Sequence, residues 1–147
     1  MKIGYTCGVY DLFHVGHLNL FERCKEHCDH LIVGVCSDDY VRVFKNKEPV
    51  ISENDRMRIV GALKCVDEVA LITNEETVDK VLAWNKFKFD VLFSGDDWKG
   101  TERFLATEKT FKENGINVEM VFFPYTQGVS STQIKNDFIF GWIGAIF

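Results

Sequence analysis

The chain opens on a short apolar segment that passes through a glycine-bearing turn into a segment with helical periodicity. Residues 2–7 are mostly apolar or β-branched, as expected of a buried strand. Residues 8–17 then read G-V-Y-D-L-F-H-V-G-H, and apolar side chains recur at helical spacing from Leu18 onward. A strand that turns directly into a helix places the unpaired N–H groups and the partial positive charge of the first helical turn at the end of the strand. The sequence therefore predicts an anion-binding strand–turn–helix unit at the start of the chain.

Two glycines and two histidines determine what this turn can bind. Gly8 and Gly16 lack side chains, so the backbone there is able to approach a ligand closely, and His14 and His17 add hydrogen-bond donors. A single histidine beside an apolar helix is more often a packing or surface residue. Two histidines that flank a glycine after a strand favour phosphate binding. A zinc site needs further ligands, and only Asp11 lies near in sequence, so we favour the phosphate site.

Apolar segments alternate with helical patterns along the rest of the chain. We expect further strands over residues 30–36, 66–73, 89–94 and 116–123, and helices over 18–27, 52–63, 77–84, 101–114 and from Ser130 or Ser131 onward. The polar residues 37–50 are interpreted as a surface loop. Strands that alternate with helices are typical of parallel sheets with right-handed crossovers. The prediction is an α/β fold, a doubly wound five-stranded parallel sheet with helices on both faces.

Charge and cysteine content exclude some classes of protein. A net charge of −5 argues against a general nucleic-acid binder, which usually carries an excess of basic residues. With 147 residues and 46% hydrophobic content, the chain has enough material for one domain with a real core. The five cysteines are an odd number and no signal peptide is recognisable, which predicts reduced thiols and a cytoplasmic location.

Three more motifs follow the first one in order. Arg56 ends S-E-N-D-R, G-D-D-W occupies residues 95–98, and T-Q-G-V-S-S-T occupies residues 126–132. With residues 8–17, these motifs resemble the signatures of the HxGH nucleotidylyltransferases, and specifically of the cytidylyltransferases that make CDP-alcohols. The resemblance covers residues 2–135, and it is strongest, in length and in the G-D-D-W element, to the bacterial branch that acts on glycerol 3-phosphate. It implies a Rossmann-like catalytic domain over residues 1–137.

The resemblance implies transfer of CMP from CTP to glycerol 3-phosphate or a similar polyol or amino-alcohol phosphate, with Mg²⁺ bound beside CTP and a homodimeric enzyme. The two histidines would donate to the phosphates, and Lys45 and Lys47 would hold the triphosphate. Asp11 would orient a histidine or bind the metal. The expected catalytic residues are His14, His17, Lys45, Lys47, Asp11 and Arg56. The expected nucleotide-binding residues are Cys7, Gly8, Val9, Tyr10, Gly16, Gly95, Asp96, Asp97, Trp98, Tyr125, Thr126, Gly128, Val129, Ser130, Ser131 and Thr132.

The chain departs from this family in two places. Tyr125 stands where the family has an arginine, and a neutral phenol cannot replace a bidentate cation. Either another cation compensates, for which the candidates are Lys99, Arg103 and Lys135, or the substrate differs. Residues 138–147 are an apolar tail too short for a membrane span. We expect this tail to form a packing or subunit surface; a membrane-touching tail and the start of a further domain are the alternatives.

Two other functions are consistent with the sequence. An adenylyltransferase of the same superfamily shares the first motif, although G-D-D-W and V-S-S-T favour the cytidylyl branch. A catalytically silent nucleotide-binding module is the other alternative, because of Tyr125 and the apolar tail.

Overall fold

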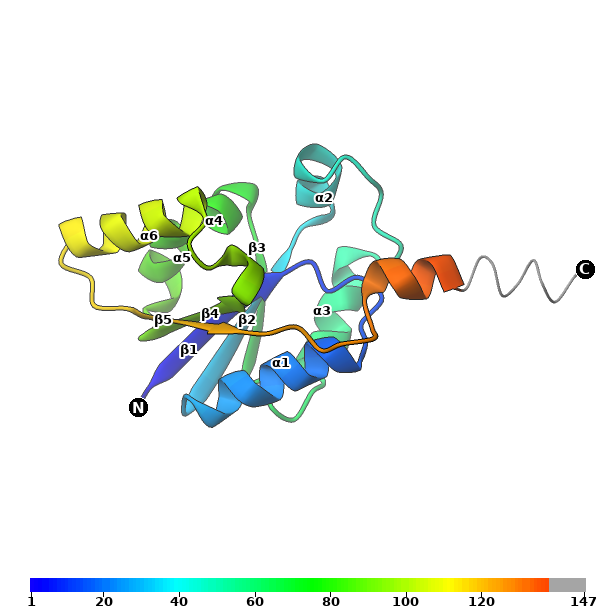
Figure 1. Cartoon of the computed structure of the whole chain (residues 1–147), viewed down its shortest axis with the longest axis horizontal. Coiled ribbons are helices and arrows are strands. Elements are labelled where there is room, and N and C mark those ends of the chain that lie inside the picture. Colours follow the sequence, from blue (N-terminus) through cyan, green and yellow to red (C-terminus); the bar gives the residue numbers. More distant parts are fainter. Residues whose placement is uncertain (138–147) are drawn as a thin grey trace, which may run out of the picture.

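A parallel five-stranded sheet forms the centre of the computed structural model, which describes residues 1–137 (Figure 1). The strands lie in the order β3-β2-β1-β4-β5, and each neighbouring pair is parallel. Their bounds are Ile3–Gly8 (β1), His30–Cys36 (β2), Glu68–Ile72 (β3), Val91–Gly95 (β4) and Glu119–Phe123 (β5). The predicted doubly wound sheet is confirmed, and every strand lies within a few residues of its predicted place.

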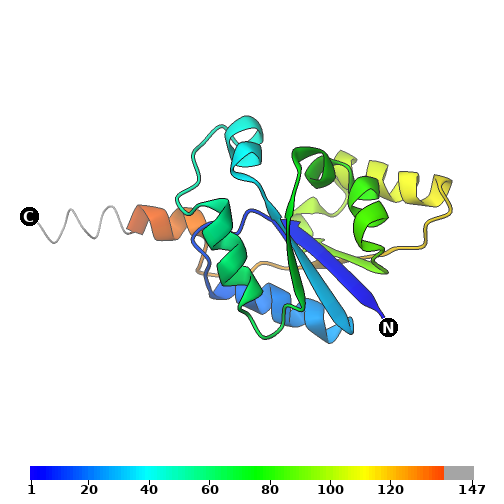
Figure 2. The same cartoon turned by 180° about the vertical axis from the view of Figure 1, so that it is seen from behind.

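Helices cover both faces of the sheet. They are α1 (Val15–Glu26), α2 (Asp38–Phe44), α3 (Glu53–Gly61), α4 (Asn74–Val78), α5 (Lys80–Phe87), the 3-10 helix η1 (Asp96–Trp98), α6 (Glu102–Glu113) and a last helix over residues 131–137. Figures 1 and 2 show α1 and α3 on one face and α4, α5 and α6 on the other. Two buried apolar clusters match these layers, because Phe21 of α1 and Val60 of α3 belong to one, and Ala83 of α5 and Phe104 of α6 to the other.

Two local predictions are wrong. Residues 37–50 are not all loop, because α2 occupies residues 38–44: the Ser37 hydroxyl caps its first turn by accepting from the Tyr40 N–H, and Tyr40 and Val41 are buried. The helix expected over residues 77–84 is instead two helices that meet at Asp79. Asp79 has an extended backbone and caps α5 by accepting from the Val81 N–H, so the chain changes direction there.

The apolar tail, residues 138–147, lies outside the described residues. Its packing role therefore remains a prediction. The homodimer and the cytoplasmic location also remain predictions. Across residues 1–137, the helices are all too short or too polar to serve as a membrane span.

Candidate active site

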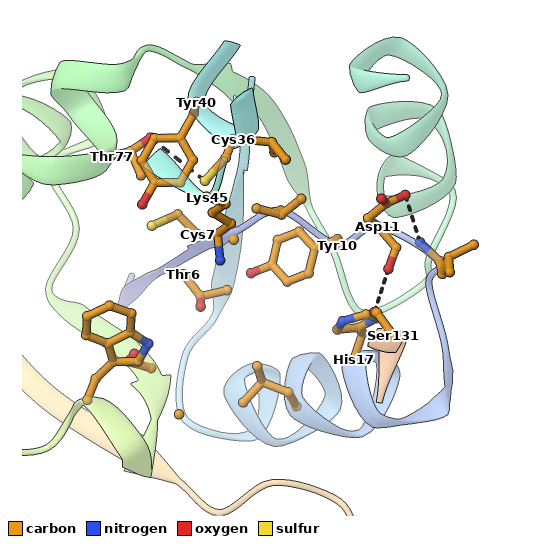
Figure 3. Close-up of a pocket in the computed structure, with 18 of the residues that line it drawn as sticks. Thr6, Cys7, Tyr10, Asp11, His17, Cys36, Tyr40, Lys45, Thr77 and Ser131 are labelled. Carbon is orange, nitrogen blue, oxygen red and sulfur yellow. Dashed lines mark hydrogen bonds between the residues drawn. The ribbon is translucent and has the colours of Figure 1, made fainter. Parts of the chain in front are cut away.

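A cleft opens at the carboxyl ends of β1 and β4, where the strand order reverses (Figure 3). Ligands of open α/β sheets bind at such a switch point. The main cleft has a volume of about 350 Å³, and a side cavity of about 350 Å³ adjoins it. The two spaces share five lining residues, namely His17, Leu20, Gly95, Tyr125 and Ser131. One elongated ligand is therefore able to occupy both spaces and pass His17.

The two predicted histidines lie together at the start of α1. His14 is the N-cap residue, and its Nδ1 accepts from the Gly16 N–H at 3.0 Å, while Nδ1 of His17 accepts from the His14 N–H at 3.2 Å. The two rings stack with their centroids 3.9 Å apart. A neutral imidazole whose Nδ1 accepts a hydrogen bond carries its proton on Nε2. Both rings are therefore fixed as Nε2–H donors.

Gly8 and Gly16 make room for rings of the protein itself. A Cβ atom on Gly16 would lie 2.7 Å from Cε1 of His14, and a Cβ on Gly8 would lie 2.8 Å from the Tyr10 ring. Both distances are shorter than the contacts that Cβ atoms make in real protein structures. The glycines thus permit the arrangement of the histidine pair and of the buried Tyr10, whose ring packs edge-on against His17.

Burial keeps both histidines neutral near pH 7. It lowers the pKa of His17 to about 4, with a further contribution from the neighbouring His14. Burial also lowers the pKa of His14. The pair therefore offers two neutral hydrogen-bond donors to a phosphate, without a fixed positive charge.

The lowered pKa of His17 makes stability depend on pH. The ordinary histidine pKa of 6.5 applies to the unfolded chain, so between pH 6.5 and about 4 the unfolded state binds a proton that the folded state does not. We expect His17 to remove roughly 1–2 kcal/mol from the free energy of unfolding as the pH falls from 7 to 4, since its partial exposure weakens the effect. Urea denaturation at pH 7, 5.5 and 4 measures this change. His17→Gln should lack this contribution, and an unchanged pH dependence in that variant would contradict the assignment.

Asp11 fastens the segment that carries the predicted phosphate-binding lysines. Its two carboxylate oxygens accept from the backbone N–H groups of Val50 at 2.7 Å and Ile51 at 2.9 Å. Its carbonyl oxygen accepts from the hydroxyl of Ser131 at 2.6 Å, which ties the start of the last helix to the same point (Figure 3). Asp11 lines the main cleft, and its carboxylate is already used to hold the loop.

Arg56 supports the cleft from behind. Its side chain is buried and donates to the carbonyl oxygens of Val9, Cys36 and Ile51 at 2.7–2.9 Å, and to the carboxylate of Asp38 at 2.7 Å. It is not among the residues that line either space. Residues 45–50, which carry Lys45 and Lys47, are called the lysine loop. The structure thus places Arg56 in the supporting shell, where it joins the ends of β1 and β2 to Ile51, the residue after this loop.

Most of the other predicted residues line the two spaces. The main cleft is lined by Cys7, Gly8, Val9, Tyr10, Lys45, Lys47, Gly95, Trp98, Tyr125, Ser131 and Thr132, and the side cavity by Gly16, Thr126, Val129 and Ser130 among others. Asp96, Asp97 and Gly128 line neither space. The exposed Asp97 instead accepts a hydrogen bond from Tyr125, and Gly128 forms the turn with a φ of 83°.

Tyr125 does not take over the role of the family arginine. Its hydroxyl donates to the Asp97 carboxylate at 2.9 Å, and partial burial together with this bond raises its pKa well above the ordinary value. The Tyr125 side chain is therefore neutral, and Asp97 accepts its hydroxyl proton in a hydrogen bond. Of the three candidate compensating cations, Arg103 and Lys135 line the main cleft, whereas Lys99 lies along a separate groove beside β5.

Positive charge is concentrated in the main cleft although the chain is acidic overall. Its basic residues are Lys45, Lys47, Lys80, Arg103 and Lys135, and its acidic residues are Asp11 and Glu48. The net charge of the whole chain is −5. Such a local excess attracts a polyanion. The sequence analysis did not include Lys80 among the site residues. A sequence pattern does indicate it, because Lys80 lies three residues before the buried Ala83 and so on the buried face of the same helix.

Comparison with known proteins supports the predicted resemblance. The family described as cytidylyltransferase-like matches residues 5–137. A glycerol-3-phosphate cytidylyltransferase of Bacillus spizizenii is 39% identical over 93% of this chain and 97% of its own length. An FAD synthase of Thermococcus onnurineus is 38% identical over 80% of this chain and 76% of its own. The crystal structure of a lipopolysaccharide core biosynthesis protein from Thermoplasma volcanium superimposes with a TM-score of 0.74 at 28% identity, covering 86% of this chain and 99% of that one.

Proposed function

The chain belongs to the cytidylyltransferase-like family of nucleotidyltransferases, and on this premise we propose that it transfers CMP from CTP to a small alcohol phosphate. One observation carries the proposal: two neutral imidazoles, each fixed as an Nε2–H donor, lie side by side, with His17 lining both the basic cleft and the side cavity and His14 lining the side cavity. The relative from Bacillus spizizenii is named for this reaction on glycerol 3-phosphate.

In the proposed reaction, an oxygen of the alcohol phosphate attacks the α-phosphorus of CTP in line. The new P–O bond forms as the bond to the β-phosphate oxygen breaks, and pyrophosphate leaves. The protein supplies no nucleophile, so its contribution is positioning and stabilisation of the developing charge. His14 and His17 donate to the α-phosphate and the leaving oxygen, and Lys45 and Lys47 hold the β- and γ-phosphates.

The side cavity is the proposed place of the cytidine. Its walls come from the T-Q-G-V-S-S-T segment, from Pro124 and from α1. Asn19 of α1 donates to the hydroxyl of Thr126 at 3.2 Å and so holds this segment against the helix. The main cleft then receives the triphosphate and the alcohol phosphate.

Magnesium would enter with the nucleotide. Within residues 1–137, His, Cys, Asp and Glu side chains form no cluster of three or more suited to a metal ion, and both oxygens of the Asp11 carboxylate already accept backbone N–H groups. Triphosphate oxygens and water are suitable ligands for this ion. We propose that Mg²⁺ is held mainly by the phosphates, where it would neutralise their charge, and that Asp11 contributes by holding the loop.

Adenylyl transfer is the second candidate, and the FAD synthase relative favours it. We expect pyrophosphate release only when CTP, Mg²⁺ and an alcohol phosphate are present together, with kcat/KM for CTP at least about tenfold above that for ATP. The experiment follows pyrophosphate with either nucleotide and a panel of glycerol 3-phosphate, phosphocholine, phosphoethanolamine and FMN. Preference for ATP would replace the proposal with adenylyl transfer. A thermal shift by CTP without pyrophosphate release would indicate a silent module.

A further inference from the structure

One cysteine, Cys7, lies in the wall of the main cleft beside a buried cation. Lys80 is 5% exposed, and its Nζ donates to Sγ of Cys7 at 3.2 Å. Throughout residues 1–137, Lys80 forms no ion pair with a carboxylate, so a thiolate at Cys7 would supply the missing negative charge. A neighbouring cation stabilises the thiolate, which is the nucleophilic form of cysteine. The proposed transfer needs no nucleophile from the protein, so it leaves this thiol unused.

The position of Cys7 makes its sulfur accessible from the cleft. Cys7 is a free cysteine and only partly buried, and it lines the main cleft. Figure 3 shows Cys7 on the side of the pocket away from His17. A small reagent that enters the cleft is therefore able to reach the sulfur without passing the histidines.

The other cysteines lack this arrangement. Burial raises the pKa of each of the other four thiols, namely Cys24, Cys28, Cys36 and Cys65. Cys28 donates its proton to the carbonyl oxygen of Cys24 at 3.3 Å, and Cys36 accepts from the Thr77 hydroxyl at 3.8 Å. Among the described residues, Cys7 is the cysteine whose sulfur accepts from a cation. The chain thus keeps four protonated thiols and one that is suited to react.

An unpartnered donor lies beside Cys7. The Tyr5 hydroxyl is buried and makes no hydrogen bond within residues 1–137. Burial raises the pKa of Tyr5 well above its ordinary value, so the hydroxyl keeps its proton. A Cβ atom on Gly34 would lie 2.7 Å from the Tyr5 oxygen and 3.2 Å from Cβ of Cys7, so the two side chains adjoin. A buried donor without a partner is unfavourable, and an oxygen atom on the Cys7 sulfur would give it one.

Cys36 is not positioned to form a disulfide with Cys7, although it lines the same cleft. The register of β1 and β2 pairs Cys7 with Gly34, so Cys36 lies two residues further along β2. Strand geometry then separates the two Cα atoms by about 8 Å, beyond the roughly 7 Å that a disulfide bridges. An oxidised Cys7 is therefore expected to remain a sulfenic acid in the folded chain.

We propose that Cys7 is a site of reversible oxidation by peroxides, and that its oxidation blocks the main cleft. The sulfur attacks one oxygen of hydrogen peroxide, the S–O bond forms as the O–O bond breaks, and Cys–SH + H₂O₂ gives Cys–SOH + H₂O. Sulfur loses two electrons and the peroxide gains them. Lys80 stabilises the attacking thiolate, and Tyr5 donates to the oxygen that is added. This oxygen occupies space at the end of β1, and a thiol reductant restores the cysteine.

The first test measures the modification and needs no turnover. The full chain is treated with hydrogen peroxide and dimedone, which traps sulfenic acids, and mass spectrometry of its peptides reports the labelling of each cysteine. We expect Cys7 to be labelled at least about tenfold faster than Cys28 or Cys65, the other two partly buried thiols. Lys80→Gln should slow labelling of Cys7 by about tenfold, whereas Lys109→Gln, at an exposed position of α6, should not change it.

Tyr5→Phe separates the role of the hydroxyl from that of Lys80. This variant should give less trapped sulfenic acid at Cys7, because the added oxygen loses a donor. The rate at which iodoacetamide alkylates Cys7 should stay at the wild-type value, since alkylation adds no oxygen. Circular dichroism checks that each variant is folded.

The second test follows pyrophosphate release, and only this part rests on the proposed function. Peroxide should remove most of the wild-type activity, and dithiothreitol should restore it. Cys7→Ser, compared with its own untreated rate, should resist peroxide, whereas Cys65→Ser should be inactivated like the wild type.

Three results would overturn the proposal. They are labelling of Cys7 no faster than that of Cys28 and Cys65, a Cys7–Cys36 disulfide in place of the sulfenic acid, and inactivation of Cys7→Ser to the same extent as the wild type. Absent pyrophosphate release by the untreated wild type would contradict the proposed function instead, and the labelling experiment would still decide whether Cys7 is the oxidised residue.

Discussion

Replacing His14 by asparagine or His17 by glutamine is expected to lower kcat/KM for CTP by about 10²- to 10³-fold, as removal of one fixed donor to developing charge does elsewhere. Each ring is an Nε2–H donor whose Nδ1 is held by the backbone. Asparagine is a strong N-cap residue and glutamine is a good residue at the third helical position. Both variants therefore keep the start of α1 while the imidazole is lost.

His30→Gln is the matched control for these variants. His30 lies at the first residue of β2, at the end of the sheet opposite the cleft, where it pairs with Glu68 at 3.3 Å. Its kcat/KM should stay within about twofold of the wild type. Steady-state pyrophosphate release gives the rates, and circular dichroism with thermal melting checks the fold. Near-normal turnover in folded His14→Asn and His17→Gln would show that the imidazoles are not the groups that stabilise the reacting phosphates.

The sequence predicted the structure correctly where local interactions limit which residue types can occupy a position. Residues 2–27 predicted a strand, a turn and a helix with two histidines at its start, and the structure has β1, α1 and a histidine N-cap there. Apolar runs located all five strands because strands covered on both faces have few polar residues. These features depend on neighbours in sequence, which is why a sequence pattern predicts them.

Other features depend on contacts between distant segments. Asp11 binds the N–H groups of Val50 and Ile51, 39 and 40 residues away, and nothing near Asp11 signals those partners. Lys80 and Arg103 meet at the carbonyl oxygen of Thr77 only because α4, α5 and α6 pack on the same face of the sheet. Helix α2 was missed because its short apolar face is interrupted by the exposed Arg42 and Val43.

The second large effect is expected when the Asp11 carboxylate no longer anchors the lysine loop. Asp11→Asn replaces an acceptor oxygen by an NH₂ group that faces a backbone N–H of residue 50 or 51, so the loop should lose its anchor. We expect KM for CTP to rise about ten- to a hundredfold, because Lys45 and Lys47 then no longer hold fixed positions near the phosphates. Asp39→Asn, an exposed position on α2, is the matched control and should leave KM unchanged.

A double-mutant comparison separates loop anchoring from metal binding. If Asp11 acts through the lysines, adding Asp11→Asn to a Lys45→Met, Lys47→Met variant should change KM for CTP by less than about twofold, because residues that act as a unit are not additive. If Asp11 is a magnesium ligand instead, Asp11→Asn should raise the Mg²⁺ concentration needed for half-maximal rate in both backgrounds, and the effects should multiply. Limited proteolysis provides an independent readout, since cleavage between residues 45 and 51 should be faster in Asp11→Asn than in Asp39→Asn.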